Sequence, residues 1–130
     1  VHLPLTARAP SMSSSLVARQ PAGGNPQAWV VNADNNSVSV LDVLARTRVA
    51  EITVGTAPRS LAIAPDGRIW VANKQSWSIS VIDPATYAVV RTIGLPRASQ
   101  PYGIAFRPGS NSAYVALAAT GQLLRYDSTT

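Results

Sequence analysis

Three observations in the sequence predict an all-β fold made of repeated four-stranded antiparallel sheets. One segment recurs three times along the chain, apolar residues alternate with polar ones inside each copy, and turn-forming residues separate the alternating stretches. Charged residues make up 13% of the chain, about half the usual share of roughly 25%, and this composition disfavours long solvent-exposed helices. The length of the repeat then indicates which architecture these sheets form.

The recurring segment aligns WVVNADNNSVSVLD without a gap on WVANKQSWSISVID, and less closely on YVALAATGQLLRYD; these copies span residues 29–42, 70–83 and 114–127. Each copy begins with an aromatic residue, namely Trp29, Trp70 and Tyr114. Each copy ends with an acid, namely Asp42, Asp83 and Asp127. Both series advance by 41 and then 44 residues, a period typical of β-propellers, in which each repeat forms one four-stranded blade.

The middle repeat contains the four strands of such a blade. We expect them at residues 60–64, 68–73, 77–83 and 88–95, where apolar residues recur at a period of two. Pro65-Asp66-Gly67 predicts a hairpin between the first two, because Asp can bond its own backbone and Gly accepts a positive φ.

The whole chain is interpreted as a single propeller segment of about three blade equivalents. Its expected parts are a last strand of a preceding blade (1–8), a first blade (10–55) with an inserted loop (9–26), a second blade (58–96) and an incomplete third blade (101–127). Three blades are fewer than the four to eight that typically close a ring. The chain is therefore either an incomplete ring, as a fragment of a larger propeller, or half of a ring that two copies assemble, with each N-terminal strand completing the other chain's last blade.

The recurrent residues have structural interpretations. One acid per repeat places the three carboxylates on separate blades, where a short acceptor side chain can bond the amides of a turn. The three aromatic residues occupy one strand position and are expected to form the core between blades. Asn32 and Asn73 end the second strand of their repeats, where an amide can bond across the following hairpin, whereas Leu117 departs from this pattern.

The motifs WVVN, WVAN, SVSVLD, SISVID and PDG resemble the YVTN-type β-propeller repeat family, which includes surface-layer and periplasmic propeller proteins. The resemblance covers residues 28–127. It implies a propeller that acts outside the cytoplasm, in the periplasm, at the cell surface or as a secreted protein. Related repeats also form propeller domains of lactonases, quinoprotein dehydrogenases and nitrous oxide reductase, so the resemblance implies a fold and leaves the activity to loops and the channel mouth.

No set of residues typical of catalysis, of cofactor binding or of metal binding is found in the sequence. The chain has no Cys, one His at position 2 and one Lys at position 74, and its six acids are dispersed. A nucleophile with its base, or a cluster of metal ligands, needs several such groups together. The net charge of +5 comes from scattered Arg residues, which favour acidic partners without defining a nucleic-acid arm.

Three residues are candidates for a binding surface. Arg59 and Tyr102 each follow a Pro at the start of the innermost strand of a blade, which lines the mouth of a propeller channel. An Arg there could hold a carboxylate or phosphate, and a Tyr could stack or bond. Trp77 replaces Asn36 in a hairpin and is a candidate contact for a partner chain, a sugar or a base. The alternatives are ordinary surface residues for the first pair and packing on the next blade for Trp77.

Three functions remain open from the sequence. The first is a non-catalytic binding or scaffold module that takes a protein partner or a small ligand, with no cofactor. The second is the propeller domain of a larger redox or hydrolytic enzyme whose catalytic groups lie outside this chain. The third is nucleic-acid binding through the basic surface. The longest apolar stretch, Ala113 to Ala119, is too short to span a membrane.

Overall fold

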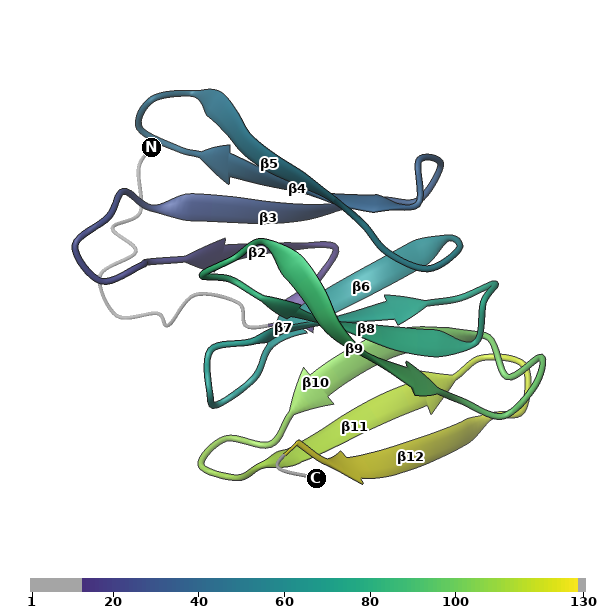
Figure 1. The fold of residues 1–130 in the computed structure, drawn as a ribbon. Helices are drawn as coiled ribbons and strands as arrows, with labels where there is room; N and C mark the ends of the chain where they lie inside the picture. Colours follow the sequence, from purple (N-terminus) through teal and green to yellow (C-terminus); the bar gives the residue numbers. More distant parts are fainter. Residues whose placement is uncertain (1–12, 129–130) are drawn as a thin grey trace, which may run out of the picture.

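The alternating stretches form antiparallel sheets in the computed structural model, which describes residues 13–128 (Figure 1). The predicted all-β class is confirmed, because the described part of the chain contains twelve strands and no helix. The first sheet has the order β2-β3-β4-β5. Its strands are β2 (Leu16–Arg19), β3 (Gln27–Asn32), β4 (Ser37–Asp42) and β5 (Thr47–Thr53).

The middle and third sheets repeat this pattern. The middle sheet has the order β1-β6-β7-β8-β9 and the third the order β10-β11-β12. The middle strands are β1 (Ser13–Ser14), β6 (Pro58–Ile63), β7 (Ile69–Asn73), β8 (Ser78–Asp83) and β9 (Ala88–Gly94). The third sheet contains β10 (Pro101–Phe106), β11 (Ser112–Leu117) and β12 (Gln122–Asp127). The strands β6 to β9 begin and end within two residues of the expected bounds.

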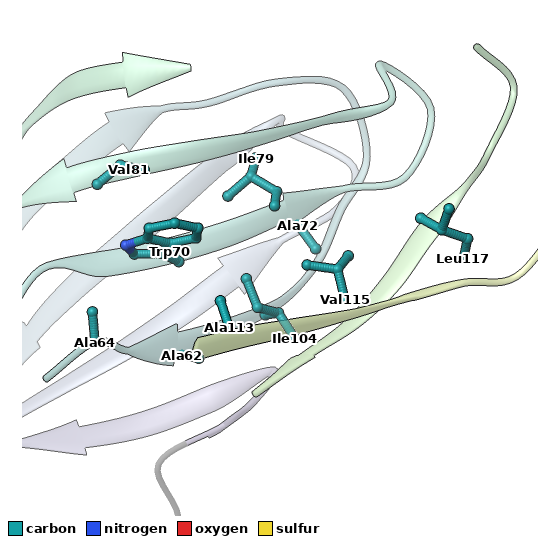
Figure 2. Packing of buried hydrophobic residues seen from close by; sticks show 10 residues of the cluster. All are labelled: Ala62, Ala64, Trp70, Ala72, Ile79, Val81, Ile104, Ala113, Val115 and Leu117. Atoms are coloured by element: carbon teal, nitrogen blue, oxygen red, sulfur yellow. The ribbon is translucent and has the colours of Figure 1, made fainter. Parts of the chain in front are cut away.

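Two apolar cores separate the three sheets, which follow one another in Figure 1. The core between the first and middle sheets is centred on Trp29, and the core between the middle and third sheets on Trp70. In the second core, alanines of the middle sheet leave room for the large side chain of Trp70 against β10 and β11 (Figure 2). The middle sheet is covered on both faces, and every residue of β7 is therefore buried.

The N-terminal region differs from the expected arrangement. The prediction of an inserted loop over residues 9–26 is wrong for residues 13–19, which contain β1 and β2. Strand β2 pairs with β3, so the first sheet has four strands of its own. Strand β1 pairs with Leu61 and Ala62 of β6, because the backbone groups on the inner edge of β6 would otherwise lack partners. The expected strand at residues 1–8 lies outside the described residues.

Two of the three acids predicted to bond the amides of a turn, Asp42 and Asp83, do so. Asp42 Oδ1 accepts hydrogen bonds from the amides of Leu44 and Ala45 at 3.0 and 2.9 Å, and Asp83 Oδ1 accepts one from Ala85 at 2.9 Å. The hairpin at Pro65-Asp66-Gly67 is also confirmed, since Gly67 has a φ of 91° and its amide donates to the carbonyl of Ala64. These bonds explain why acids recur at the end of the repeated segment.

The predicted cross-hairpin amides are confirmed as well. Asn32 Nδ2 donates to the hydroxyl groups of Ser37 and Ser39, and Asn73 Nδ2 donates in the same way to those of Ser78 and Ser80. In the third sheet Leu117 takes this place, and its side chain is buried in the second core instead. Leu117 therefore has apolar packing in place of the hydrogen bonds that the Asn side chains make across the hairpin.

The prediction that all three recurrent aromatic residues are core is wrong for Tyr114. Trp29 and Trp70 are almost completely buried, whereas Tyr114 is half-buried and belongs to neither core. The reason is positional: each aromatic residue faces the sheet that follows its own. In the described chain no sheet follows the third one.

Asp42 gives the stability of the fold a dependence on pH. The amide of Ala45 lowers the pKa of Asp42, and the Asn25 side chain and the Leu44 amide lower it further. A depressed pKa stabilises the folded state above the ordinary carboxyl pKa, and that contribution is lost as the pH falls through the lowered value. We expect Asp42→Asn to reduce the melting temperature at neutral pH, and the difference from wild type to shrink on acidification.

Thermal unfolding followed by circular dichroism at neutral and acidic pH measures this difference. Asp34→Asn changes an exposed carboxylate in another hairpin and serves as the control, with little expected effect. A difference between wild type and Asp42→Asn that stays constant with pH would contradict the assignment.

Candidate functional site

The three candidate residues lie at one end of the sheets, which we call the mouth end. It contains the starts of β6 and β10 and the hairpin that joins β7 to β8, all on the right in Figure 1. Antiparallel pairing produces this grouping: Pro58 of β6 is opposite Asn73 of β7, so Arg59 and residues 74–77 are near each other. Arg59, Trp77 and Tyr102 are therefore brought to one end.

The first contact at the mouth end joins Tyr102 to Lys74. The ammonium nitrogen of Lys74 lies 5.8 Å from the centroid of the Tyr102 ring, within the range of a cation–π interaction. Tyr102 is 53% exposed, so its ring is only partly covered. Together the two side chains present an aromatic surface next to a positive charge.

A hydrogen bond between neighbouring blades fixes the backbone of Tyr102. The hydroxyl group of Ser60 donates to the Tyr102 carbonyl at 2.7 Å, and Arg59 is the residue just before this serine. The side chain of Arg59 is exposed. The structure thus places the Arg59 backbone beside the start of β10, although it records no direct contact between the Arg59 and Tyr102 side chains.

The hairpin of residues 74–77 is tied to the segment that precedes β6. The amides of Lys74 and Gln75 donate to the carbonyls of Ala57 and Thr56 at 3.0 and 3.1 Å. The amide of Thr56 in turn donates to the Ser76 hydroxyl at 2.9 Å. These bonds hold the hairpin in place, so that Lys74 is positioned by backbone contacts and not only by its own side chain.

Trp77 lies on the other side of the same hairpin. It is half-buried, and the Arg97 guanidinium lies 6.0 Å from its ring centroid. Its φ is 50°, a conformation that suits Asn or Gly and is unusual for a bulky residue. The equivalent positions of the other two hairpins carry Asn36, with a φ of 54°, and Gly121, with a φ of 67°. A Trp is thus held where the repeat otherwise uses turn-forming residues.

Asn36 shows what the repeat loses at Trp77. The side-chain oxygen of Asn36 accepts the amide of Ala57 at 2.9 Å and so clamps the connection to the next blade. An indole has no acceptor for this bond. The backbone bond of this position is retained, because the carbonyl of Trp77 accepts the amide of Leu95 at 2.8 Å, as the carbonyl of Asn36 accepts the amide of Val54.

The charge at the mouth end is mainly positive. Arg59, Lys74 and Arg97 lie there, with Asp34 as the acid of the neighbouring hairpin. Among residues 13–128, no three side chains of His, Asp or Glu lie close enough together to hold a metal ion. Within the same range, no helix is long and apolar enough to cross a membrane. The arrangement can attract an anion and stack a flat group.

Two hollows are lined by residues other than the three candidates. One, of about 240 Å³, lies between the end of β5 and strands β8 and β9, and hydroxyl groups of Thr53, Ser78, Ser80 and Thr92 line it. The other, of about 520 Å³, lies at the opposite end between two hairpins, and Arg107 is the charged residue of its lining. Tyr102, Arg59 and Trp77 line neither hollow, so the mouth end is a surface site.

Sequence reasoning overlooked Lys74 and Arg97 as members of this site. The place of Lys74 at this end could have been predicted, because the only Lys of the chain directly follows Asn73, the residue that ends the second strand. The hairpin after that strand reaches the same end as the start of the next blade. Arg97 had no such signal, since the segment between Leu95 and Pro101 is longer than its counterpart and has no equivalent position.

Solved structures similar to this chain show the fold. Hydrazine synthase of Kuenenia stuttgartiensis matches at 29% identity and a TM-score of 0.56, over 75% of this chain and 32% of that chain. Dihydro-heme d1 dehydrogenase NirN, in complex with DHE, matches at 20% identity and a TM-score of 0.71, over 94% and 27%. Virginiamycin B lyase from Staphylococcus aureus matches at 19% identity and a TM-score of 0.63, over 96% and 44%.

These matches identify the three sheets as blades of a β-propeller whose ring is not closed. The chain spans less than half the length of each of the three structures. No curated protein matches the sequence significantly. A family model described as "Domain of unknown function (DUF5074)" matches residues 23–128, which is most of the chain. This chain therefore belongs to the DUF5074 family.

Proposed function

We propose that this chain is a non-catalytic binding module, which recognises an anionic group beside a flat apolar group at its mouth end. The observation that carries the proposal is the position of Lys74 over the ring of an exposed Tyr102, next to the start of the strand that bears Arg59. A cation and an exposed ring on neighbouring blades can bind the two parts of one ligand together.

The conformation of Trp77 supports a binding role. A bulky residue at positive φ costs stability, and such residues concentrate at sites where they contribute to function. Because Asn36 and Gly121 show that the hairpin accepts ordinary turn residues, the fold does not require this Trp. Its half-exposed ring would extend the mouth surface outward and offer a second place for a flat group.

The cellular location belongs to the same proposal. The YVTN-type motifs support a propeller that works outside the cytoplasm, in the periplasm, at the cell surface or as a secreted protein. A partner in that setting would be a protein or a small ligand with a carboxylate or a phosphate, which Arg59 and Lys74 attract.

Titration with phenyl phosphate tests the proposal, because this probe joins one anion to one flat ring. Isothermal titration calorimetry should show weak binding that Lys74→Met or Tyr102→Leu reduces about two- to fivefold, the effect of losing one exposed charge or ring contact to the probe. Arg59→Gln should also weaken it. Arg68→Gln changes an exposed Arg at the opposite end of the same sheet and should leave the affinity unchanged.

Phenol and inorganic phosphate, each carrying one half of the probe, should bind more weakly than phenyl phosphate. The proposal fails if phenyl phosphate does not bind, or if Arg68→Gln weakens binding as much as Arg59→Gln does. Loss of binding in a variant counts only when its far-UV circular dichroism spectrum matches that of the wild type.

A second candidate function is the propeller domain of a larger enzyme. It is favoured by the comparison with hydrazine synthase, in which the matched region is 32% of an enzyme chain. In that case the catalytic groups would lie outside residues 13–128, and the mouth end would hold part of a substrate. Turnover by a longer polypeptide that contains this segment, with retention of activity in Lys74→Met, would separate the enzyme from the mouth-end site proposed above.

A further inference from the structure

Apart from one arginine at its edge strand, the outer face of the third sheet has the composition of a buried face. We define it by Ala105, Tyr114, Ala116, Leu123 and Arg125. The strand register places these residues on one side, since Tyr114 is opposite both Ala105 and Arg125, and Ala116 is opposite Leu123. Leu123 is 66% exposed, and Tyr114 is half-buried. A large aliphatic and an aromatic side chain are thus left in contact with water.

The same repeat positions are buried in the middle sheet, where they form the core against the third sheet (Figure 2). The equivalent residues are Ala62, Trp70, Ala72, Ile79 and Val81, all at most 2% exposed. The first sheet has the corresponding set against the middle sheet, with Trp29, Val38 and Val40 buried. The outer face of the third sheet therefore continues an interface that the chain already forms twice.

The outer face of the first sheet is the complementary half of such an interface. We define it by Leu16, Ala18, Ala28, Val30 and Leu41, which the register places on one side. Their equivalents in the middle sheet are Leu61, Ile63, Ile69, Val71 and Ile82, which pack against the first sheet. Leu16 and Leu41 are 50% and 37% exposed, so this face too is apolar and open.

We propose that these two faces bind each other between two copies of the chain, so that the third sheet of each copy packs on the first sheet of the other. Residues 13–128 of one copy form three sheets, so these residues of two copies supply six blades, which is within the four to eight of closed propellers. A second copy is the occupant because the chain carries both complementary faces itself.

This inference deepens the proposed function, because a closed ring would bring two mouth-end sites around one channel. The two proposals fail separately, since assembly is measured without ligand and phenyl phosphate binding can be measured on a monomer. The contact geometry follows from the existing core. Trp70 meets Phe106 edge-on with ring centroids 5.2 Å apart. The equivalent pair across the new interface is Tyr114 and Ala18 of the second copy.

Sedimentation equilibrium of wild type and of two matched variants tests the interface. Leu123 and Leu44 are both 66% exposed, but Leu44 lies in the turn between β4 and β5, and its equivalent in the middle sheet, Ala85, is exposed beside the existing interface. Wild type should form dimers, Leu123→Arg should weaken dimerisation at least about tenfold by placing a charge in an apolar contact, and Leu44→Arg should have no effect. Circular dichroism shows whether each variant is folded.

Cysteine cross-linking tests the predicted pair independently, because the chain has no native Cys. Mixing Ala18→Cys with Tyr114→Cys and a bifunctional maleimide that spans about 10 Å, the spacing of packed sheets, should yield cross-linked dimers, and neither variant alone should do so. The proposal is overturned if the wild type stays monomeric at micromolar concentration. It is also overturned if Leu123→Arg and Leu44→Arg behave alike, or if each Cys variant cross-links with itself as well as with the other.

Discussion

Trp70→Ala is expected to lower the free energy of unfolding by about 3–5 kcal/mol, the usual cost of removing a large aromatic side chain from a core. Trp70 is 2% exposed and lies between the middle and third sheets, where its ring meets Phe106 edge-on. The alanines around it, Ala62, Ala64 and Ala72, cannot extend to fill the space. Urea unfolding followed by circular dichroism measures the loss.

Tyr114→Ala is the matched control for Trp70→Ala, since both residues occupy the same position of the repeat. Tyr114 is half-buried, and no sheet of residues 13–128 packs against its face, so its removal should cost only about 1 kcal/mol. Both variants are measured at the same low protein concentration, where association between copies adds little to stability. Equal costs for the two variants would contradict the assignment of Trp70 to the interface between blades.

The sequence alone predicted the strands of the middle sheet well, for a physical reason. Both faces of this sheet are covered, so each residue of β7 must suit a buried environment, and a shift by one residue would exchange its two faces. The strands between Trp70 and the closing acid Asp83 therefore show a clear alternation of residue types in the sequence. Turns were equally predictable, since Asp66-Gly67 and Asp42 act through bonds to their own neighbours.

The N-terminal strands were not predictable in the same way. Leu16–Arg19 is short, and only Val17 of its residues is fully buried, so it has little alternation to detect. Strand β1 forms because the edge of β6 offers unpaired backbone groups, a cause that lies in a distant part of the chain. Local patterns cannot show pairing of this kind.

The mouth end was predicted in part. Arg59 and Tyr102 followed from their place after Pro at the start of the innermost strands. Their relation to Lys74 depends on how one blade packs on the next, which periodicity does not specify. Trp77 was noted as an unusual turn residue, but its positive φ and its contact with Arg97 appear only in three dimensions.

Gly55→Ala is expected to destabilise the fold by about 2–4 kcal/mol, because the new methyl group would overlap a buried side chain. A Cβ on Gly55 would lie 2.7 Å from Cγ and Nδ2 of Asn73, and it would also overlap the Ser76 hydroxyl. Asn73 is completely buried and holds the hydroxyl groups of Ser78 and Ser80, so it cannot rotate away without breaking both bonds.

A shift of the backbone at Gly55 would not relieve this overlap cheaply. The next residue, Thr56, donates its amide to Ser76, and the amide of Val54 donates to the carbonyl of Asn36 at 2.9 Å. Gly94→Ala is the control, because no atom lies within 4 Å of its new Cβ and its φ is not positive. The free energy of unfolding of Gly94→Ala should be unchanged or up to about 1 kcal/mol higher, since Ala restricts the unfolded chain. Urea midpoints that fall equally in both variants would contradict overlap with Asn73 as the cause of the loss at Gly55.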